Sequence, residues 1–414
     1  MNPSNQARSA NWLVFGAMIA LTANIAPAIF HTFGLFIKPV SEELGFSRSA
    51  LSAALLIITA VTVVVSPYVG RLIDRHGVTK ITMPCIIIFA VAVAALAGTH
   101  SLAYFLAAFF VMGLVGIAHS PLSYSREISR RFDRHRGKAL GIASAGIGIG
   151  GAIIPLIAQR SIEAYGWRSA YLILGAIIIS VGLIGFYFFQ RGIDNRLMNR
   201  GGQAAGGPGG DAEKRFKKST IFWSLLVGFL IMGIGINGSM SHLGAILSDR
   251  GGSLSFAGSA QVAVGISMIV GRVLCGFLLD RFAPYNIATL FVLIPMAGIA
   301  TLATSTDPTV IVLGCVLLGL GLGGEADLLT FLTARYFNLA SYAEISGYFF
   351  SAFTLGVGVG SFALARSFDM MGSYQTGMFL SVALLLVLCV VFQSLRFMAP
   401  AVAPRLDDAV VPAP

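Results

Sequence analysis

Seven ionisable side chains in this 414-residue sequence lie inside long apolar stretches, where charge is otherwise rare. They are His31, His119, Arg126, His242, Arg272, Glu325 and Asp327. Placing a guanidinium in a lipid interior costs about 2.5–3.5 kcal/mol of insertion free energy. Arg272 lies near the middle of its apolar stretch, so it is a candidate functional residue. Its planar fork donates two parallel hydrogen bonds that match a carboxylate. We expect an anion-binding site at Arg272, with an internal ion pair to Glu325 or Asp327 as the alternative.

Glu325 and Asp327 are two residues apart, so on one helix their side chains point about 200° apart. They cannot share a face, and each must meet a different neighbour. Burial disfavours the charged form of a carboxyl, and a nearby arginine restores it. This combination suits a proton carrier, which we assign to Glu325 or to Asp327. The alternative for Glu325 is a structural hydrogen bond.

Histidines and aromatic residues supply further candidate contacts in the same stretches. His31 and His242 make either structural hydrogen bonds or an external gate with proton access. Tyr124 is a candidate hydrogen-bond donor to a ligand, since a buried phenol needs a partner. Tyr348 and Phe353 lie in an aromatic cluster and are candidates for contact with a ligand's carbon skeleton, although most of that cluster should be packing.

The elements that must position these residues are membrane-spanning helices. The chain is 56% hydrophobic and 11% charged, against about 25% charged residues in a soluble domain. Its apolar stretches each reach the roughly 20 residues that cross a bilayer. They predict twelve helices, at 12–38, 48–74, 79–98, 101–126, 137–160, 168–190, 220–248, 255–281, 285–304, 308–334, 343–366 and 374–397. We therefore expect an all-α integral membrane protein.

Basic residues predict the orientation of these helices. With the N-terminus inside, six of the 28 Lys and Arg residues fall in external loops, two fall within spans, and the remaining 20 are cytoplasmic. This asymmetry predicts two cytoplasmic termini and a multi-pass protein of the inner, cytoplasmic membrane. The net charge of +10 is thereby a topology signal, with some attraction to anionic lipid, and not a sign of nucleic-acid binding.

Several function classes lack their sequence signatures. The four cysteines lie in apolar helices at spacings that suit neither a metal site nor a disulfide framework. The sequence contains no P-loop, HExxH or CxxC motif, so we expect no enzyme, no metal and no cofactor. No removable signal peptide is expected at the N-terminus. The tails are too short for the soluble signalling domain that a membrane sensor would add.

A Gly-rich, charged segment divides the chain into two halves. We expect an N-terminal six-helix bundle at 1–190, a cytoplasmic linker at 191–219, a C-terminal six-helix bundle at 220–398 and a cytoplasmic tail at 399–414. "GRLIDRHG" at 70–77 matches "GFLLDRF" at 276–282 at an offset of 206 residues.

Other matches extend this internal repeat along the halves. The glycine-rich segment at 141–151 matches 347–360 at the same offset of 206, which also pairs His119 with Glu325, while His31 matches His242 at 211. Near-constant offsets indicate two pseudo-symmetric bundles related about an axis along the membrane normal. The pairing adds His119 to the candidate proton and ligand groups.

The residues that follow the second predicted helix resemble the loop signature of the major facilitator superfamily. The signature residues are Gly70, Asp74, Arg75 and Gly77, with Asp280 and Arg281 in the second half. The resemblance covers the whole chain and implies the major facilitator fold. It implies that Asp74 meets the N-terminus of a neighbouring helix and latches one conformation. The alternative is a tight basic turn in which Gly supplies φ > 0.

Within that superfamily the chain resembles the monocarboxylate and oxalate/formate porters. The phrases that carry this are "FGLFIKPVSEELGFSRSALS", "YGWRSAYLILG" and the arginine of "GRVLCGF". The resemblance implies that Arg272 binds the substrate anion. Two positions depart from the group: Phe353 stands where the oxalate/formate antiporter has a second cation, and Met268 stands where monocarboxylate porters have an acid. One fixed cation suits one carboxylate, and any proton-linked acid must lie elsewhere.

The sequence therefore predicts a secondary transporter that moves a small organic monocarboxylate by alternating access, with proton symport. The partners are the acid, a proton and membrane lipid. The alternatives are an organic anion exchanger, an exporter of drugs or neutral solutes, and a membrane sensor on a transporter scaffold. An exporter would not need Arg272.

Overall fold

The computed structural model describes residues 3–132, 136–193, 216–249, 254–337 and 342–398. All regular structure in these ranges is helical. Residues 194–215 of the predicted linker lie outside them, and the predicted C-terminal tail lies outside them entirely.

The six predicted spans of the N-terminal half correspond to ten helical elements in the described ranges, and the last of these, α7, contains two spans. The elements are α1 (Pro3–Thr22), η1 (Ala26–Phe30), α2 (Phe33–Leu44), α3 (Arg48–His76), α4 (Val78–Ala95), η2 (Leu96–Gly98), α5 (Leu102–Gly116), η3 (Ile117–His119), α6 (Pro121–Arg131) and α7 (Arg136–Gly192). Side-chain caps fix the starts of two of them. Ser47 accepts a hydrogen bond from the Ala50 N–H before α3, and Ser101 accepts one from the Tyr104 N–H before α5.

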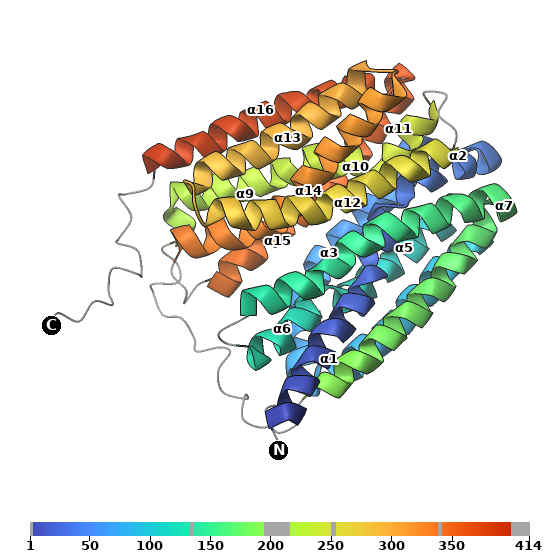
Figure 1. Ribbon diagram of the computed structural model, residues 1–414. Helices are drawn as coiled ribbons and strands as arrows, with labels where there is room; N and C mark the ends of the chain where they lie inside the picture. Colours follow the sequence, from blue (N-terminus) through green and yellow to red (C-terminus); the bar gives the residue numbers. More distant parts are fainter. Residues whose placement is uncertain (1–2, 133–135, 194–215, 250–253, 338–341, 399–414) are drawn as a thin grey trace.

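The element α7 contains two predicted spans. Its apolar part, Ala139–Gly192, has 54 residues; a straight helix of that length would extend about 80 Å, against a hydrocarbon core of about 30 Å. Gly166 breaks it with φ 78° and ψ 166°, a conformation that favours glycine. Figure 1 shows the two arms lying antiparallel. With this division, the 11 long apolar helices of the described residues make twelve crossings.

The C-terminal half repeats the pattern. Its elements are η4 (Phe216–Lys218), α9 (Thr220–Met232), η5 (Gly233–Asn237), α10 (Gly238–Ser241), α11 (Leu243–Asp249), α12 (Leu254–Leu279), α13 (Pro284–Thr304), α14 (Pro308–Tyr336), α15 (Tyr342–Met371) and α16 (Gln375–Met398). The predicted bounds agree within a few residues for most spans. The first and eleventh spans run further than predicted, to Leu44 and Met371.

Matched breaks interrupt the first and seventh spans, which were predicted as continuous helices. Each contains a π-helical turn, η1 and η5, and the two turns lie at an offset of 207 residues. In η1, Pro27 contributes no N–H, and the Asn24 side chain accepts from the Ala26 N–H at 3.1 Å. In η5 two glycines weaken the helix. π turns often mark functional positions in membrane and soluble helices.

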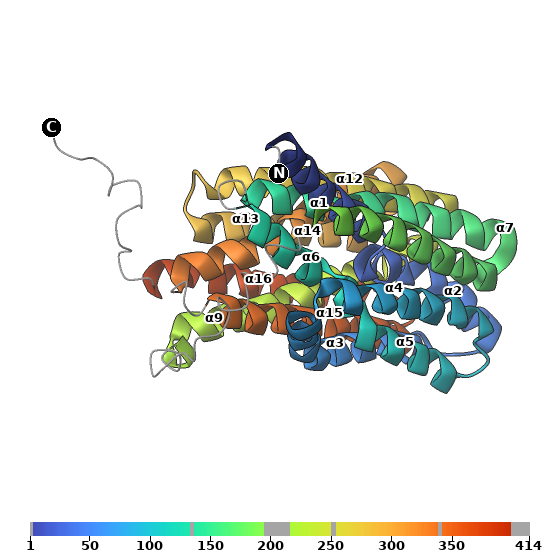
Figure 2. The ribbon, with the colours of Figure 1, turned by 90° about the horizontal axis from the view of Figure 1, so that it is seen from below.

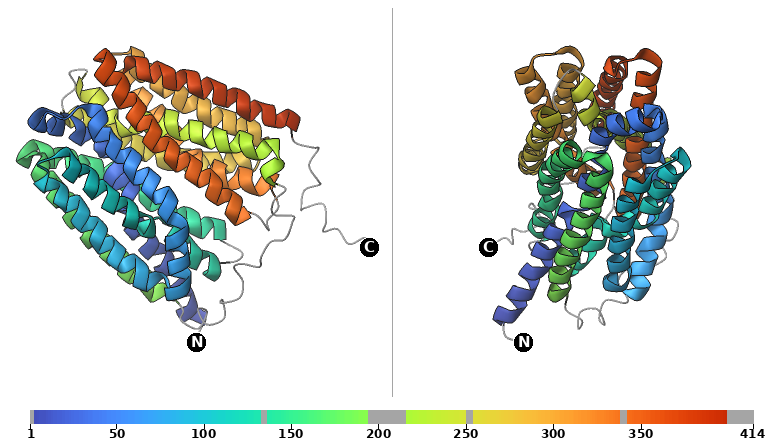
Figure 3. Two further views of the ribbon diagram at one scale, coloured as in Figure 1. Left: turned by 180° about the vertical axis from the view of Figure 1, so that it is seen from behind. Right: turned by 90° about the vertical axis from the view of Figure 1, so that its right-hand side faces the viewer.

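The two halves meet at one end of the bundle and diverge toward the other (Figures 1 and 3). Between the halves α3 packs along α15, α7 packs along α12, and α2 packs against α11. We call the joined end, which carries the turns at 45–47 and 372–374, the closed end. The ends that diverge carry the start of α1 and the end of α16, and we call them the terminal end. Figure 2 views the same two groups of helices from below.

Candidate functional site

Arg272 lies in α12 and faces α14. Its Nε is 4.0 Å from Asp327 Oδ2 and donates a long hydrogen bond of 3.5 Å to the Gly323 carbonyl. The side chains of Arg272 and Asp327 are 21% and 36% exposed. In the described part of the chain, the two terminal nitrogens of Arg272 have no protein partner. The fork that suits a carboxylate is therefore available, while Asp327 contacts only its edge.

Glu325 points away from this pair, as the two-residue spacing predicts. It is 7% exposed, and Asn237 Nδ2 lies 3.0 Å from each carboxylate oxygen. Asn237 is the last residue of η5, so the contact joins the seventh and tenth spans. Sequence reasoning missed Asn237. An amide directly after the apolar run 225–236 was the available signal.

His31 lies on the same side of the molecule as Arg272. A Cβ added at Gly151 of α7 would be 2.8 Å from His31 Nδ1 and 3.7 Å from the Met268 methyl group. Met268 is one helical turn before Arg272 on α12. His31 thus sits where the two halves touch, one layer toward the closed end from the guanidinium.

His119 and Tyr124 form a separate pair inside the N-terminal half. His119 Nδ1 is 2.9 Å from the Tyr124 hydroxyl, and both side chains are fully buried. Tyr124 packs edge-on against Phe189, with ring centroids 5.0 Å apart. His119 Nε2 faces the position of Gly182 and has no hydrogen-bond partner among the described residues. This pair therefore lies against the sixth span, away from Arg272.

The two aromatic candidates of α15 lie at different depths. Tyr348 is 39% exposed and accepts a hydrogen bond from Lys217 Nζ at 3.1 Å, beside η4. This places it near the terminal end. The Phe353 backbone packs against Gly233 at the start of η5, and its side chain is partly buried. Phe353 is thus level with the π turn of the seventh span.

The predicted latch residues lie at the turns of the terminal end. Gly77 joins α3 to α4 with φ 85°, as expected of the tight turn. Arg75, Asp280 and Arg281 are exposed, and the Arg281 guanidinium lies 4.0 Å from the centroid of Phe277. The side chains of Asp74 and Arg126 lie outside the described part of the structure. Gly70 has open space around its Cα.

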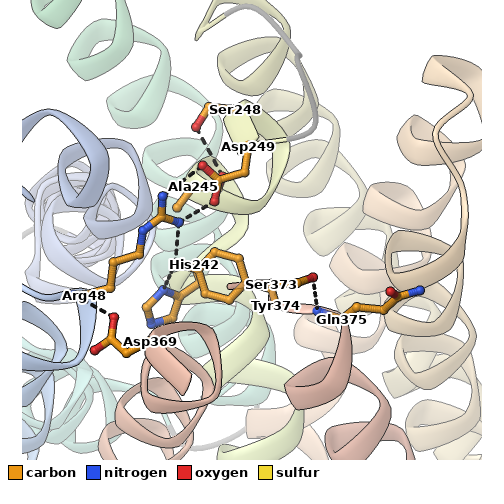
Figure 4. Close-up of polar contacts among 9 residues, drawn as sticks. All are labelled: Arg48, His242, Ala245, Ser248, Asp249, Asp369, Ser373, Tyr374 and Gln375. Atoms are coloured by element: carbon orange, nitrogen blue, oxygen red, sulfur yellow. Dashed lines mark hydrogen bonds and ion pairs between the residues drawn. The ribbon is translucent and has the colours of Figure 1, made fainter. Parts of the chain in front are cut away.

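A polar cluster joins the two halves at the closed end (Figure 4). We call Arg48, His242, Asp249, Asp369 and Tyr374 the closed-end cluster. Arg48 pairs with Asp249, with 2.9 Å between Nη2 and Oδ1, and donates from Nη1 to the Tyr374 hydroxyl at 3.1 Å. Asp369 accepts from the backbone N–H of Arg48 at 3.2 Å and caps the start of α3. One N-terminal residue therefore binds three residues of the other half.

His242 extends this cluster inward. Its Nε2 is 3.0 Å from the Ser361 carbonyl, which can only accept, so Nε2 carries the proton. Its Nδ1, 3.1 Å from the Tyr374 hydroxyl, then accepts. Donation runs from Arg48 to Tyr374, from Tyr374 to His242 and from His242 to Ser361.

His31 and His242 occupy different levels. The π turns match at an offset of 207, whereas these histidines are 211 apart, which sets His242 about one turn further toward the closed end. The structural equivalence of the halves therefore pairs His31 with Gly238. His242 joins the closed-end cluster, while His31 lies beside Met268.

A second polar contact at the closed end lies within the N-terminal half. The Trp167 indole donates to Glu43 Oε2 at 2.5 Å, and Arg168 Nη2 donates to Glu43 Oε1 at 2.8 Å. The hydrogen bond from Trp167, with that from Arg168, lowers the pKa of Glu43 below its usual value of 4.5. This contact ties the end of α2 to the turn inside α7.

Comparison with known proteins identifies the family. The model of the Major Facilitator Superfamily matches residues 13–361. The MFS-type transporter YhjX of Escherichia coli (strain K12) is 23% identical over 381 residues, covering 87% of this chain and 88% of YhjX. Monocarboxylate transporter 11 of Mus musculus is 25% identical over 367 residues, covering 87% of this chain and 77% of that protein.

A solved structure agrees with these sequence matches. The crystal structure of the nucleoside transporter NupG covers 96% of this chain and 99% of its own, with a TM-score of 0.72 at 14% identity. At that identity the likeness concerns the fold alone. With the twelve crossings, the two repeated halves and a family match over most of the sequence, this chain belongs to the Major Facilitator Superfamily of membrane transporters.

Proposed function

We propose that this protein is a secondary active transporter that carries a small organic monocarboxylate together with a proton. The observation that carries the proposal is the Arg272 side chain, two helical turns before the end of α12. Its Nε contacts Asp327 at 4.0 Å, and its Nη pair has no partner among the described residues. A carboxylate that engaged both terminal nitrogens would gain two charge-assisted hydrogen bonds.

In this proposal Arg272 is the one cation that the described residues offer to the substrate, and it sets the substrate class. Phe353 occupies the position at which a second cation would serve a second carboxylate, and it lies level with the π turn of the seventh span. A dicarboxylate would bury its second charge without a partner, which costs several kcal/mol unless that group is protonated. Monocarboxylate transporter 11, one of the similar proteins, has a name that fits this class.

Proton coupling in the proposal uses the two acids of α14. The substrate carboxylate competes with Asp327 for Arg272, so substrate binding changes the charge balance around both carboxyls. Glu325, buried against Asn237, takes up and releases the proton. His119 and Tyr124 pair with each other inside the N-terminal half, and we give them a structural role in place of the predicted one.

Alternating access in the proposal uses the two ends of the bundle. The positive-inside pattern assigns the terminal end to the cytoplasm. The closed end then faces outward, and the closed-end cluster acts as the external gate predicted for His242. Asp74 latches the opposite conformation from the terminal end. Both termini are cytoplasmic, in the inner membrane.

The proposal is tested by uptake of radiolabelled propionate into proteoliposomes, with succinate as competitor at a pH where both are ionised. We expect Arg272→Ala to lower uptake at least about 30-fold, since truncating one partner of a desolvated charge pair costs roughly 2–5 kcal/mol. Arg272→Lys keeps the charge but loses the fork, and should also fail. Arg160→Ala, an exposed cation of α7, is the matched control.

Three outcomes separate the possibilities. Wild-type uptake by Arg272→Ala would exclude this anion site. Stronger competition by succinate than by an equal concentration of unlabelled propionate would contradict the single-cation argument. Uptake that requires internal substrate and ignores a pH gradient would identify an organic anion exchanger.

A further inference from the structure

Asn237 is the closest described partner of the buried carboxyl on α14. Its Nδ2 is 3.0 Å from both Oε1 and Oε2 of Glu325, so a single amide nitrogen covers the whole carboxylate. The two residues come from spans that are 88 positions apart in sequence. No sequence motif predicts this contact. Asn237 is the last residue of the π turn in the seventh span, and the first span has a matching π turn.

The π turn fixes where Asn237 points. A π turn inserts one extra residue, so every side chain beyond it rotates by about 100° relative to a continuous α-helix. Gly235, in the same turn, lets it pack against α16, because a Cβ there would lie 2.9 Å from the Leu385 side chain. Asn237 thereby reaches α14, where η5 makes a local contact and the amide meets Glu325.

An amide can serve both charge states of the acid. An ionised carboxylate only accepts hydrogen bonds, whereas a protonated one donates through its O–H. The asparagine NH2 satisfies the first state, and its carbonyl oxygen satisfies the second after the amide group turns over. A buried carboxyl that lost this partner would pay a desolvation penalty in its charged form.

We propose that Asn237 is a positioning residue for proton coupling: its amide donates to ionised Glu325 and turns over to accept from the protonated acid. This rests on the proposed function, in which Glu325 carries the proton. Rotation of the Asn237 amide keeps the Glu325 carboxyl hydrogen-bonded in both charge states, so neither state leaves a buried polar group without a partner. Proton uptake and release at Glu325 then proceed without moving α14.

Other titratable groups near Glu325 are few in the described elements that pack on α14. α13 has no charged residue, and η5 has none. On α12, Arg272 contacts Asp327 and Gly323, and Cys275 Sγ lies 3.8 Å from the Gly324 carbonyl. The remaining titratable groups on α12 to α15 are Tyr285, Cys315, Asp327, Arg335, Tyr336, Tyr342, Glu344, Tyr348, Arg366 and Asp369. Asp327 faces Arg272, Cys315 lies ten positions before Glu325 in the sequence, and the others stand toward the helix ends.

The test compares Asn237→Leu, which removes both hydrogen-bonding functions at similar volume, with Asn237→Ser, which keeps a donor and an acceptor. Propionate uptake into proteoliposomes is measured against external pH, beside exchange at equal pH on both sides. We expect Asn237→Leu to move the midpoint of pH-driven uptake to higher pH by about one unit, and to slow uphill uptake at least about tenfold. In Asn237→Leu the rate of exchange should change less than twofold, and the thermal unfolding temperature should change little. Asn237→Ser should restore most of the wild-type dependence of uptake on pH.

The Glu325→Gln background separates this inference from the proposed function. If Asn237 acts through Glu325, adding Asn237→Leu to Glu325→Gln changes nothing further. A Glu325→Gln protein with intact pH-driven uptake would overturn the proposed proton site. If Glu325→Gln fails but Asn237→Leu keeps the wild-type pH profile, only the role of Asn237 is wrong. Equal loss of exchange and uphill uptake, without rescue by Asn237→Ser, would make Asn237 a packing residue and overturn the inference.

Discussion

At the scale of single residues, the looseness of the Arg272–Asp327 contact is the property that suits transport. Their separation of 4.0 Å is at the limit for an ion pair, whereas charge-assisted hydrogen bonds are about 2.7–2.9 Å long. A tight pair would hold the guanidinium against any substrate. A loose pair lowers the free-energy cost of burying the Arg272 charge when no substrate is bound. It leaves the two terminal nitrogens of the guanidinium available for shorter hydrogen bonds to a substrate. In the proposed function, Asp327 is the partner that the substrate carboxylate displaces from Arg272.

The two acids of α14 should behave differently when neutralised. Glu325→Gln mimics the protonated acid, so we expect it to lose uphill propionate uptake driven by a pH gradient by at least about tenfold, since 1.4 kcal/mol is already a factor of ten. It should keep exchange, which requires no deprotonation. Asp327→Asn, the matched change two residues away, should alter the apparent affinity for propionate and retain pH-driven uptake. The reverse pattern would assign the proton to Asp327.

At the scale of helices, interruptions decide what the spans present to one another. η1 and η5 break the first and seventh spans at equivalent points, and the breaks bring His31 beside Met268 and Asn237 beside Glu325. The positive φ of Gly166 turns α7 back on itself and exposes its Trp167–Arg168 corner to the end of α2. The interruptions at η5 and Gly166 thus create polar contacts that a straight helix would not make.

The contact of Glu43 with that corner predicts a pH dependence. The hydrogen bonds from Trp167 and Arg168 lower the pKa of Glu43 in the folded protein, so its contribution to stability is present above the ordinary value of 4.5 and is lost as the pH falls below it. We expect Glu43→Gln to lower the thermal unfolding temperature at pH 7 and to flatten its fall between pH 5 and about pH 3.

Glu42→Gln is the control for this prediction, because Glu42 is an exposed neighbour on the same helix. The effect should be small and should shrink with added salt, since Glu43 is about half exposed. Identical pH profiles for Glu43→Gln and Glu42→Gln would show that the corner contributes nothing to stability.

At the scale of the whole molecule, the closed-end cluster connects the halves chiefly through Arg48, with further hydrogen bonds from the Ser49 N–H to Asp369 and between Ser52 and His242. Arg48 pairs with Asp249, donates to Tyr374 and stacks on Phe368 at 3.8 Å, while its backbone N–H is capped by Asp369. Rocking the halves apart at this end must break all four contacts together. In the proposed alternating access, these contacts favour the conformation that is closed at this end.

Removing this connection should shift the conformational population. We expect Arg48→Ala to raise hydrogen–deuterium exchange of segments 48–60 and 243–249 at least about tenfold, the shift given by roughly 1.4 kcal/mol. Arg48→Asp combined with Asp249→Arg should return part of the protection, and Arg160→Ala should leave it unchanged. Unaltered exchange in Arg48→Ala would show that apolar packing alone holds this end closed.

The sequence alone determined the properties that depend on local pattern. Apolar length located the twelve crossings, the repeat offset of 206 separated the halves, and the period of 3.6 residues set Glu325 and Asp327 on opposite faces. These predictions needed no knowledge of neighbours, because hydropathy and helical period are properties of a segment by itself. The loop signature around Gly77 identified the superfamily for the same reason.

The tertiary structure decided which polar residues meet. Asn237 reaches Glu325 across 88 residues of sequence, and Arg48 reaches Asp249 of the other half across 201. His119 pairs with Tyr124, five residues away, across the break between η3 and α6. Hydropathy does not reveal a π turn, and one extra residue rotates every later side chain by about 100°. Contacts between helices depend on such rotations and on packing between distant segments, so they were fixed only when the helices came together.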